Sequence, residues 1–463
     1  MCASPFLEIF FNQFLNEAQC LMFDRRSDKH VLGGTTSSPT TRAELGQEGR
    51  QQSAHGSLRI LYLTAESYPT FRPDVSVLFG RYLPLEGVVC DVVAPCAQAT
   101  SAAPDWAGTA ITRHIEGGGL RRRLLSVWHG LASAWRADVG LYQALQVRDM
   151  PVVAALVLPI ARCKRLPFFY WMSYPIPEGQ IQLARDRGLR SGWMKFLYPW
   201  ISGRVGRFLL KRCVLRHADH VFVQSPRMKD ELVAAGVAAS RMTPVLMGVD
   251  LASMNADLAP RQLDARLVGR RVIGYLGTLE RPRQIERLFE MLALVRREVP
   301  DAVLLIVGDD EDLFHRQWLR DQANLAGVTE AVIWAGWMPT RAAWQLISGA
   351  EVALSPIPRG PLLDPASPTK VPEYLALGIP VVCNDNPDQA SAIRESGAGI
   401  CVPYSAGEFA AAVLMLLAQG PATRSAMIEA GKRYVAEKRD YRVLAKQLAE
   451  VYRHLLQPIG GVG

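Results

Sequence analysis

Short runs of apolar residues alternate with longer amphipathic stretches along this chain from Leu58 onward. In the first half, five runs have the length and composition of β-strands: 58–64, 88–94, 152–158, 168–172 and 220–224. The stretches between them are long enough for helices and have helical periodicity. This alternation predicts parallel strands joined by crossover helices.

The same alternation starts again at Arg271. The predicted strands of this second half are 271–277, 302–308, 331–335, 351–355 and 380–383. A final helix over 441–456 is predicted from its period. We therefore expect an α/β protein with two similar domains, 58–247 and 248–440, and a C-terminal helix, 441–457, that could pack back on the first.

Residues 1–57 lack this alternation. Between Gly33 and Ser57 the chain is rich in Gly, Ser, Thr, Gln and Arg and has no apolar period. Such a composition cannot bury enough apolar surface to offset the entropy of folding. We predict a disordered N-terminal extension.

Composition narrows the class of protein. The chain has 463 residues, a formal net charge of +8 and eight cysteines, none paired at zinc-ligand spacing. It shows no secretory signal, and its longest apolar run, 150–161, is too short to cross a bilayer. We expect a cytoplasmic protein with reduced thiols. Its modest positive charge would suit phosphorylated ligands, nucleic acid or anionic membranes equally.

The clearest chemical signal begins at Ser367. Ser367 and Thr369 can cap a helix beside Lys370, and the free N–H groups at a helix start attract an anion. Glu373, one turn further on, could accept hydrogen bonds from two vicinal ribose hydroxyls. Gly378 then ends the helix before a buried strand. The pattern predicts half of a nucleotide site, although capped helices with two solvated charges are also common.

Three earlier loops of the second half end predicted strands in the manner of ligand loops. Their notable residues are Gly277, Thr278 and Arg283, then Gly308 and Asp309, then Gly336 and Trp337. Each loop alone is also compatible with an ordinary surface turn. No GxGxxG or Walker lysine motif occurs, which weighs against dinucleotide-binding enzymes and ATPases.

Taken together, the order and spacing of these loops resemble glycosyltransferase family 4. Members of that family have two Rossmann-like parallel-sheet domains facing a cleft, the GT-B fold. The resemblance runs over nearly all of residues 58–457 and is most specific in 277–283 and 364–382. It implies a retaining transferase that takes a sugar from a nucleoside-diphosphate donor held mainly by the second half. It also implies that no metal ion is needed.

The resemblance carries over to individual residues. Arg283 stands at the family's lysine position, whereas Thr278 stands where the family usually has an arginine. Glu373 matches the second of two family glutamates; the first falls on Pro365, and neighbouring Asp364 could substitute. Arg283, Lys370 and Glu373 are the expected catalytic residues. The expected donor-binding residues are Gly277, Thr278, Arg283, Gly308, Asp309, Gly336, Trp337, Asp364, Ser367, Thr369, Lys370 and Glu373.

The first half is expected to hold the acceptor. Arg148, Asp149 and Ser173 lie where family members line the acceptor side. Arg72 and Asp74, in the loop after the first predicted strand, would face the same sheet edge. Arg148 and Asp149 could contact donor phosphate or an acceptor hydroxyl, or could equally form a structural ion pair at a strand end.

Residues 185–216 combine nine Arg and Lys with a single acid, Asp186, and with interleaved aromatic and aliphatic residues. A basic helix with interfacial aromatics is typical of contact with an anionic membrane surface. An ordinary amphipathic helix that packs its apolar face on the sheet is the favoured alternative. A lipid-linked acceptor would make membrane contact useful.

We therefore predict a hexosyltransferase-type GT-B glycosyltransferase in glycan or polysaccharide synthesis. Its partners would be a nucleoside-diphosphate sugar and a saccharide or lipid-linked saccharide acceptor, without metal or nucleic acid. It would be cytoplasmic, with a peripheral membrane contact through 185–216 left open. Two alternatives are a GT-B sugar-nucleotide epimerase and a non-catalytic nucleotide-binding or membrane-surface scaffold.

Overall fold

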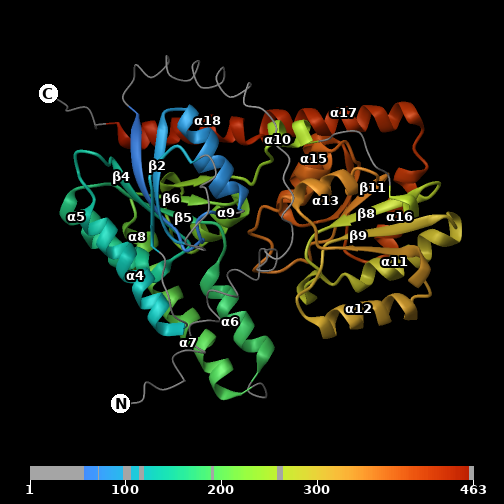
Figure 1. Ribbon diagram of the computed structural model, residues 1–463, viewed down its shortest axis with the longest axis horizontal. Coiled ribbons are helices and arrows are strands. Elements are labelled where there is room, and N and C mark those ends of the chain that lie inside the picture. Colours follow the sequence, from blue (N-terminus) through green and yellow to red (C-terminus); the bar gives the residue numbers. More distant parts are fainter. Residues whose placement is uncertain are drawn as a thin grey trace, which may run out of the picture. The chain divides into compact units, whose positions relative to one another are not determined.

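The computed structural model describes residues 57–70, 72–96, 106–113, 119–188, 192–257 and 264–457. The predicted extension 1–57 lies outside these residues except for Ser57. The chain divides into two units, each built on one sheet (Figure 1). Unit 1 comprises the chain up to Val223, Leu232–Thr243 and the residues from Ala445; unit 2 comprises Gln224–Glu231 and Pro244–Leu444.

The sheet of unit 1 has the strand order β3-β2-β1-β4-β5-β6-β7, and its pairings from β3 to β6 are parallel. Its strands are β1 (Leu58–Leu63), β2 (Val88–Pro95), β3 (Ala110–Arg113), β4 (Ala144–Arg148), β5 (Phe168–Met172), β6 (His220–Val223) and β7 (Met242–Pro244). The helices along this part of the chain are α3 (Leu83–Leu85), α4 (Gly119–Arg136), α5 (Pro151–Lys164), α6 (Ile176–Arg187), α7 (Trp193–Leu209), α8 (Leu215–His217) and α9 (Pro226–Ala234).

The sheet of unit 2 has the order β10-β9-β8-β11-β12-β13 and is parallel throughout. Its strands are β8 (Arg271–Leu276), β9 (Ala302–Val307), β10 (Val332–Gly336), β11 (Val352–Ser355), β12 (Val381–Asn384) and β13 (Gly399–Val402). The helices are α10 (Leu251–Asp257), α11 (Glu286–Glu298), α12 (Leu313–Leu325), α13 (Thr340–Ile347), α14 (Lys370–Ala376), α15 (Pro387–Ser396), α16 (Ala406–Leu417), α17 (Pro421–Lys438) and α18 (Tyr441–Leu456).

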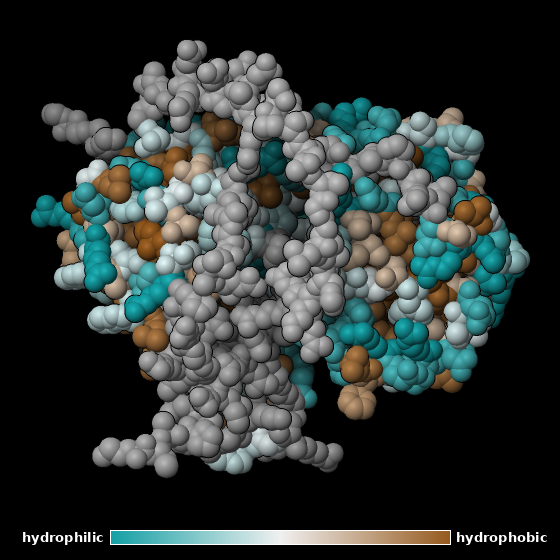
Figure 2. Space-filling model, in the orientation of Figure 1, coloured by the Kyte–Doolittle hydropathy of each residue, from teal (hydrophilic) through white to brown (hydrophobic). Residues whose placement is uncertain are grey.

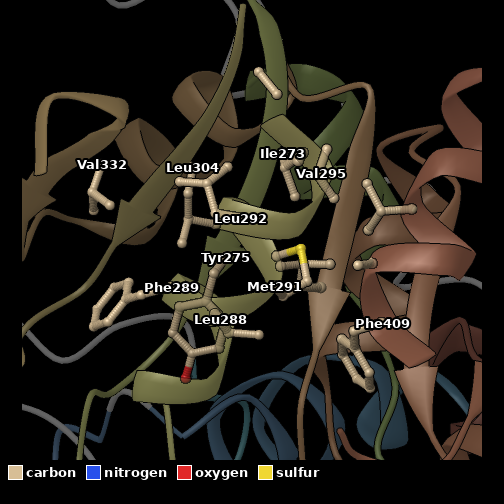
Figure 3. Packing of buried hydrophobic residues seen from close by; sticks show 14 of the residues in the cluster. Ile273, Tyr275, Leu288, Phe289, Met291, Leu292, Val295, Leu304, Val332 and Phe409 are labelled. Carbon is tan, nitrogen blue, oxygen red and sulfur yellow. The ribbon is translucent and has the colours of Figure 1, made fainter. Parts of the chain in front are cut away.

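Both faces of the unit 2 sheet are buried, as expected for parallel strands covered by crossover helices. Ile273 and Tyr275 of β8 point to one face, where they pack with Leu288 and Leu292 of α11 (Figure 3). Their neighbour Val272 points to the opposite face and a second core cluster. The predicted α/β class with two parallel sheets is thereby confirmed.

The final helix continues from unit 2 into unit 1. Within unit 1, the buried hydroxyl of Tyr452 on α18 donates to the side-chain oxygen of Gln146 on β4, at 2.6 Å. Tyr452 also packs its ring against Phe169 and Phe222. The end of α18 therefore forms part of the unit 1 core.

One predicted strand is wrong. Residues 152–158 belong to helix α5, which begins with Pro151 at a position that suits proline. Val153, Ala154, Val157, Leu158 and Ala161 are buried at helical spacing, whereas Val152 is exposed. The run is apolar on most sides, so its composition could not distinguish a helix from a buried strand. The strand in this region is β4, which the prediction missed together with the short strands β3, β7 and β13.

No helix among the described residues is both long enough and apolar enough to span a membrane. On the face shown in Figure 2, hydrophobic and hydrophilic residues alternate in small patches over unit 2. The described cysteines are all free thiols.

Candidate functional site

The candidate donor site lies in unit 2 at the carboxyl edge of its sheet. There β8 and β11 are neighbours, with β9 on the far side of β8 and β12 on the far side of β11. Open parallel sheets bind ligands where the strand order reverses in this way. The loop after β8 and the start of α14, which follows β11, flank this position.

Lys370 crosses directly over the turn at Gly277. A Cβ atom built on Gly277 would lie 2.4 Å from Cε and 2.6 Å from Nζ of Lys370. Gly277 also has a φ of +153°, a conformation that side chains disfavour. The ammonium of Lys370 lies 5.9 Å from the centroid of the Tyr275 ring. Glycine at position 277 therefore leaves the space that Lys370 occupies.

The three predicted glycine turns lie side by side. The N–H of Gly277 donates to the carbonyl of Val307, and the N–H of Gly308 donates to the carbonyl of Gly336, both at 2.9 Å. A Cβ atom on Gly308 would lie 1.9 Å from the carbonyl oxygen of Gly277. The backbones thus approach more closely than a side chain at Gly308 would permit.

The three glycines should differ in their response to alanine. We expect Gly308→Ala to cost about 3 kcal/mol in the free energy of unfolding, because it meets a fixed backbone carbonyl. Gly277→Ala meets chiefly the flexible end of the Lys370 side chain, with the Tyr275 hydroxyl oxygen further away at 3.2 Å, so about 1–2 kcal/mol is expected. Gly336→Ala is the control, since its Cβ would enter open space and only its positive φ costs energy. Urea denaturation measures the free energy of unfolding of all three variants. Equal losses would contradict the close approach of the glycine turns.

Four charged side chains surround this turn: Arg283, Lys370, Glu280 and Glu373. Burial lowers the pKa of Lys370, and the positive charge of Arg283 lowers it further, against opposing effects of Glu373 and Glu280. Burial also raises the pKa of Glu373, although Lys370, Thr369 and Trp344 counteract this. The site thus places the guanidinium of Arg283 beside a lysine whose charged form an anionic ligand would favour.

Glu280 was not predicted as a site residue, although it lies between Thr278 and Arg283 in sequence. Burial raises its pKa, and Arg283 opposes that shift most strongly. Its proximity to Lys370 depends on the fold of the β8 loop. No sequence pattern distinguishes it from an ordinary solvated glutamate.

Two tyrosines hold the elements of the site together and were also missed. The hydroxyl of Tyr374 on α14 accepts a hydrogen bond from the N–H of Leu276 at 2.8 Å, which ties the helix to the end of β8. The hydroxyl of Tyr275 donates to the carbonyl of Thr278 at 2.7 Å and fixes the loop. Thr278, at the family's arginine position, therefore contributes a backbone acceptor to the loop itself.

Ser367 is turned inward. Its hydroxyl donates to Asp388 at 2.8 Å and accepts from the N–H of Met247 at 3.0 Å. Arg439 completes this buried group through a 2.6 Å ion pair with Asp388. Thr369, the residue before α14, makes no side-chain capping bond. The structure therefore gives Ser367 a positioning role behind the start of α14, where sequence had suggested contact with phosphate.

Asp364 is also engaged within unit 2. Both of its oxygens accept from Arg359 at 2.9 Å, and the N–H of Gly360 donates at 3.1 Å. Burial would raise its pKa, but these hydrogen bonds hold the pKa below its usual value. Pro365, at the family's glutamate position, offers its carbonyl to Ser225 at 2.6 Å.

The remaining predicted donor residues are placed at the same edge. Asp309 pairs with Arg316 at 3.0 Å, so its charge is already partly balanced. Trp337 is exposed beside Gly336, which has open space above its Cα. Trp337 is therefore the aromatic side chain of this edge with the most surface left for a ligand.

In unit 1 the five predicted acceptor-side residues form one network at the carboxyl edge of the sheet. Arg148 is fully buried and donates to Asp74 at 2.6 Å and to the Ser173 hydroxyl at 3.2 Å. Asp149 accepts from the N–H and the hydroxyl of Ser173. Arg72 pairs with Asp74 at 3.2 Å. The geometry favours the structural ion pair for Arg148 over contact with a ligand.

Glu66, which follows β1, is the most exposed of the charged side chains in this network and was not predicted. It pairs with Arg72 at 3.3 Å. Burial raises the pKa of Glu66, whereas Arg148 and Arg72 hold the pKa of buried Asp74 at about 2 in spite of its burial. Glu66, with Arg72 as its partner, is therefore the group of this network best placed to meet an acceptor.

Within the described part of the chain, no group of three or more His, Cys, Asp or Glu side chains is arranged to hold a metal ion.

One protein-family model matches a segment of the second unit. Residues 270–419 match the family model described as "Glycosyl transferases group 1". A search of curated protein sequences found no match. The matched segment contains the glycine turns and the start of α14.

Solved structures extend the likeness to both units. Anabaena HepE in complex with UDP-glucose has a TM-score of 0.60 at 15% identity, covering 86% of this chain and 100% of that one. Sucrose-phosphate synthase from Thermosynechococcus elongatus has a TM-score of 0.60 at 18% identity, over 86% and 99% of the two chains. The lipopolysaccharide outer core galactosyltransferase WaaB, in its apo form, has 0.55 at 13%, over 86% and 100%. The expected GT-B fold and the resemblance to this family are confirmed.

Proposed function

Because residues 270–419 match the family model of the group 1 glycosyl transferases, we propose that the chain moves a hexose from a nucleoside-diphosphate sugar to an acceptor hydroxyl with retention of configuration. The acceptor would be a saccharide or a lipid-linked saccharide, used on the cytoplasmic side in glycan or polysaccharide synthesis. A UDP-sugar is the first donor to test, since HepE was solved with UDP-glucose.

One observation carries this proposal: Lys370 lies in the space left by Gly277, beside Arg283 and Glu373. Two cations at the reversal of strand order suit the two phosphates of a donor. Lys370 and Val371 begin α14, and their backbone N–H groups have no partner within the helix. Glu373, one turn along, would then accept from the ribose hydroxyls.

In the reaction, negative charge develops on the departing nucleoside diphosphate. Arg283 and Lys370 would stabilise that charge, which lowers the barrier only because both groups are already in place. A phosphate oxygen of the leaving group would accept the proton of the acceptor hydroxyl. Glu66 and Arg72 of unit 1 would orient the acceptor.

The thermal stability of the protein should report the donor. A ligand that binds only the folded state adds about 2.7 kcal/mol to the free energy of unfolding when its concentration is a hundred times Kd. We expect UDP to raise Tm more than GDP or ADP, and Glu373→Ala to abolish most of that rise. Glu429→Ala, on the exposed side of α17, is the matched control. No shift with any nucleotide would remove the transferase proposal and favour a scaffold at a membrane surface.

Donor affinity should depend on pH on both sides of an optimum. The pKa of Lys370 is lowered in the free protein, so rising pH removes its charge before that of an ordinary lysine, and UDP affinity should fall by up to about tenfold per pH unit. The pKa of Glu373 is raised, so falling pH protonates it early and weakens ribose binding. Uridine lacks phosphate. Its affinity, measured by calorimetric titration, should therefore keep the fall at acidic pH and lose the fall at alkaline pH. The same alkaline fall for uridine would contradict the assignment of Lys370 to phosphate.

A further inference from the structure

Helix α7 presents its large apolar residues to solvent. Five of them are between 37% and 61% exposed: Trp193, Leu197, Ile201, Val205 and Phe208. They recur every three or four residues, so they form one stripe along the helix, here called the α7 stripe. In a soluble protein such a stripe ordinarily faces the core.

The opposite side of α7 is the one that packs. Gly203 and Gly206 lie on it, and a Cβ atom on Gly203 would come within 2.7 Å of Ile181 and of the carbonyl of Pro177 on α6. Glycines thus make the close helix–helix contact while the bulky residues point away. The favoured alternative for the basic segment, a helix with its apolar face packed inward, therefore does not describe α7.

Helix α4 likewise exposes its large apolar residues and packs through its small ones. Three large residues on one side of α4 are between 57% and 65% exposed: Leu124, Trp128 and Trp135. They are here called the α4 stripe. Ala134 is buried on the opposite side, together with Gly130, whose Cβ atom would lie 3.5 Å from Leu63 of β1. Two exposed tryptophans on one helix side are a large apolar surface for a protein in water.

The helices that carry the two stripes are joined by a common neighbour in unit 1. Helix α5 packs against both α4 and α7, and Figure 1 shows the three helices next to one another. Val152 and Leu156 of α5 are each 45% exposed, one turn apart. Exposed apolar residues therefore occur on all three neighbouring helices.

The charged residues of α4 and of the segment around α7 are all basic. Residues 119–136 contain four arginines, and residues 192–218 contain six Lys and Arg; neither segment contains an Asp or Glu. Arg204, Lys211 and Arg212 are exposed beside the α7 stripe, and Arg204 stacks on Trp200 at 5.0 Å. Long basic side chains beside tryptophans match the boundary of an anionic bilayer, where rings enter the headgroup layer and cations meet lipid phosphates.

We propose that unit 1 binds the surface of an anionic phospholipid bilayer through the α4 and α7 stripes. Tryptophan and aliphatic side chains enter the headgroup region, and the basic residues contact lipid phosphate. The binding is peripheral and reversible. It does not depend on sugar transfer, so either proposal can fail without the other.

The test is co-sedimentation of the full chain with vesicles of phosphatidylcholine alone and of phosphatidylcholine mixed with phosphatidylglycerol. We expect binding to the mixed vesicles only, weakened by salt. Trp128→Ala with Trp135→Ala should weaken it at least about tenfold, since each ring loses its interfacial contact. Lys211→Glu with Arg212→Glu should weaken it by more than about tenfold.

Matched substitutions on exposed positions of unit 2, Phe314→Ala and Arg297→Glu, should leave vesicle binding unchanged. All of these positions are exposed, and equal Tm values will verify that the variants fold. Equal binding to both kinds of vesicle, no binding, or equal losses in the unit 2 controls would overturn the proposal. A dimer that the tryptophan variants dissociate, without vesicle binding, would assign the stripes to a second copy of the chain instead.

Discussion

Lys370→Ala is expected to lower kcat/KM for sugar transfer by about 10²–10³-fold, the usual loss when one preorganised group that stabilises developing charge is removed. Lys370 lies against Gly277 and 5.9 Å from the Tyr275 ring, which places its ammonium at the turn of the candidate donor site. Burial lowers its pKa, which means that the fold disfavours its charge. The variant should therefore keep its Tm while losing activity. Steady-state kinetics with the donor identified by thermal shift measures the effect.

Lys432→Ala is the matched control for this prediction, because Lys432 is half-exposed on α17 and pairs with Glu429 at the surface. It should retain transfer within about twofold. Lys370→Arg keeps the charge but is larger and planar, so it should recover only part of the loss. Wild-type kinetics in Lys370→Ala would show that Lys370 does not face the leaving group.

Asp388→Ala is expected to destabilise the protein by about 3–5 kcal/mol, the usual result of removing one partner from a buried ion pair. Its carboxylate lies 2.6 Å from Arg439, and both side chains are at most 5% exposed. Removing it also leaves the Ser367 hydroxyl without its acceptor. We expect a lower midpoint in urea and, because Ser367 positions the start of α14, weaker UDP binding in the fraction that folds.

The exposed ion pair of Asp385 with Arg359, at 2.9 Å, lies in the turn before α15 and supplies the comparison. Asp385→Ala should cost no more than about 1 kcal/mol, since solvent screens both charges. A similar loss of stability in the two variants would mean that the buried Asp388–Arg439 pair contributes no more to stability than an exposed ion pair. The double variant Asp388→Ala with Arg439→Met should regain stability if the penalty comes from the unpaired charge.

The sequence by itself determined the positions of five of the six unit 2 strands and the loops that form its candidate site. Buried parallel strands read as nearly continuous apolar runs, so the five strands predicted there coincide with β8 to β12 within one or two residues. The glycines and Lys370 were visible for a related reason, since turns and anion sites require particular residue types. Residues 152–158 were misassigned because a helix apolar on most sides resembles such a strand.

Only the tertiary structure decided what the polar side chains face. Ser367 turns inward because Asp388, Met247 and Arg439, distant in sequence, meet it in the fold. Arg148 is buried where Asp74, the first residue of a helical segment distant in sequence, pairs with it. Likewise, the sequence of α7 showed an apolar stripe, but not that glycines on its other side make the helix contact. A side chain's partner or burial depends on which distant segments approach it, and local sequence does not contain that information.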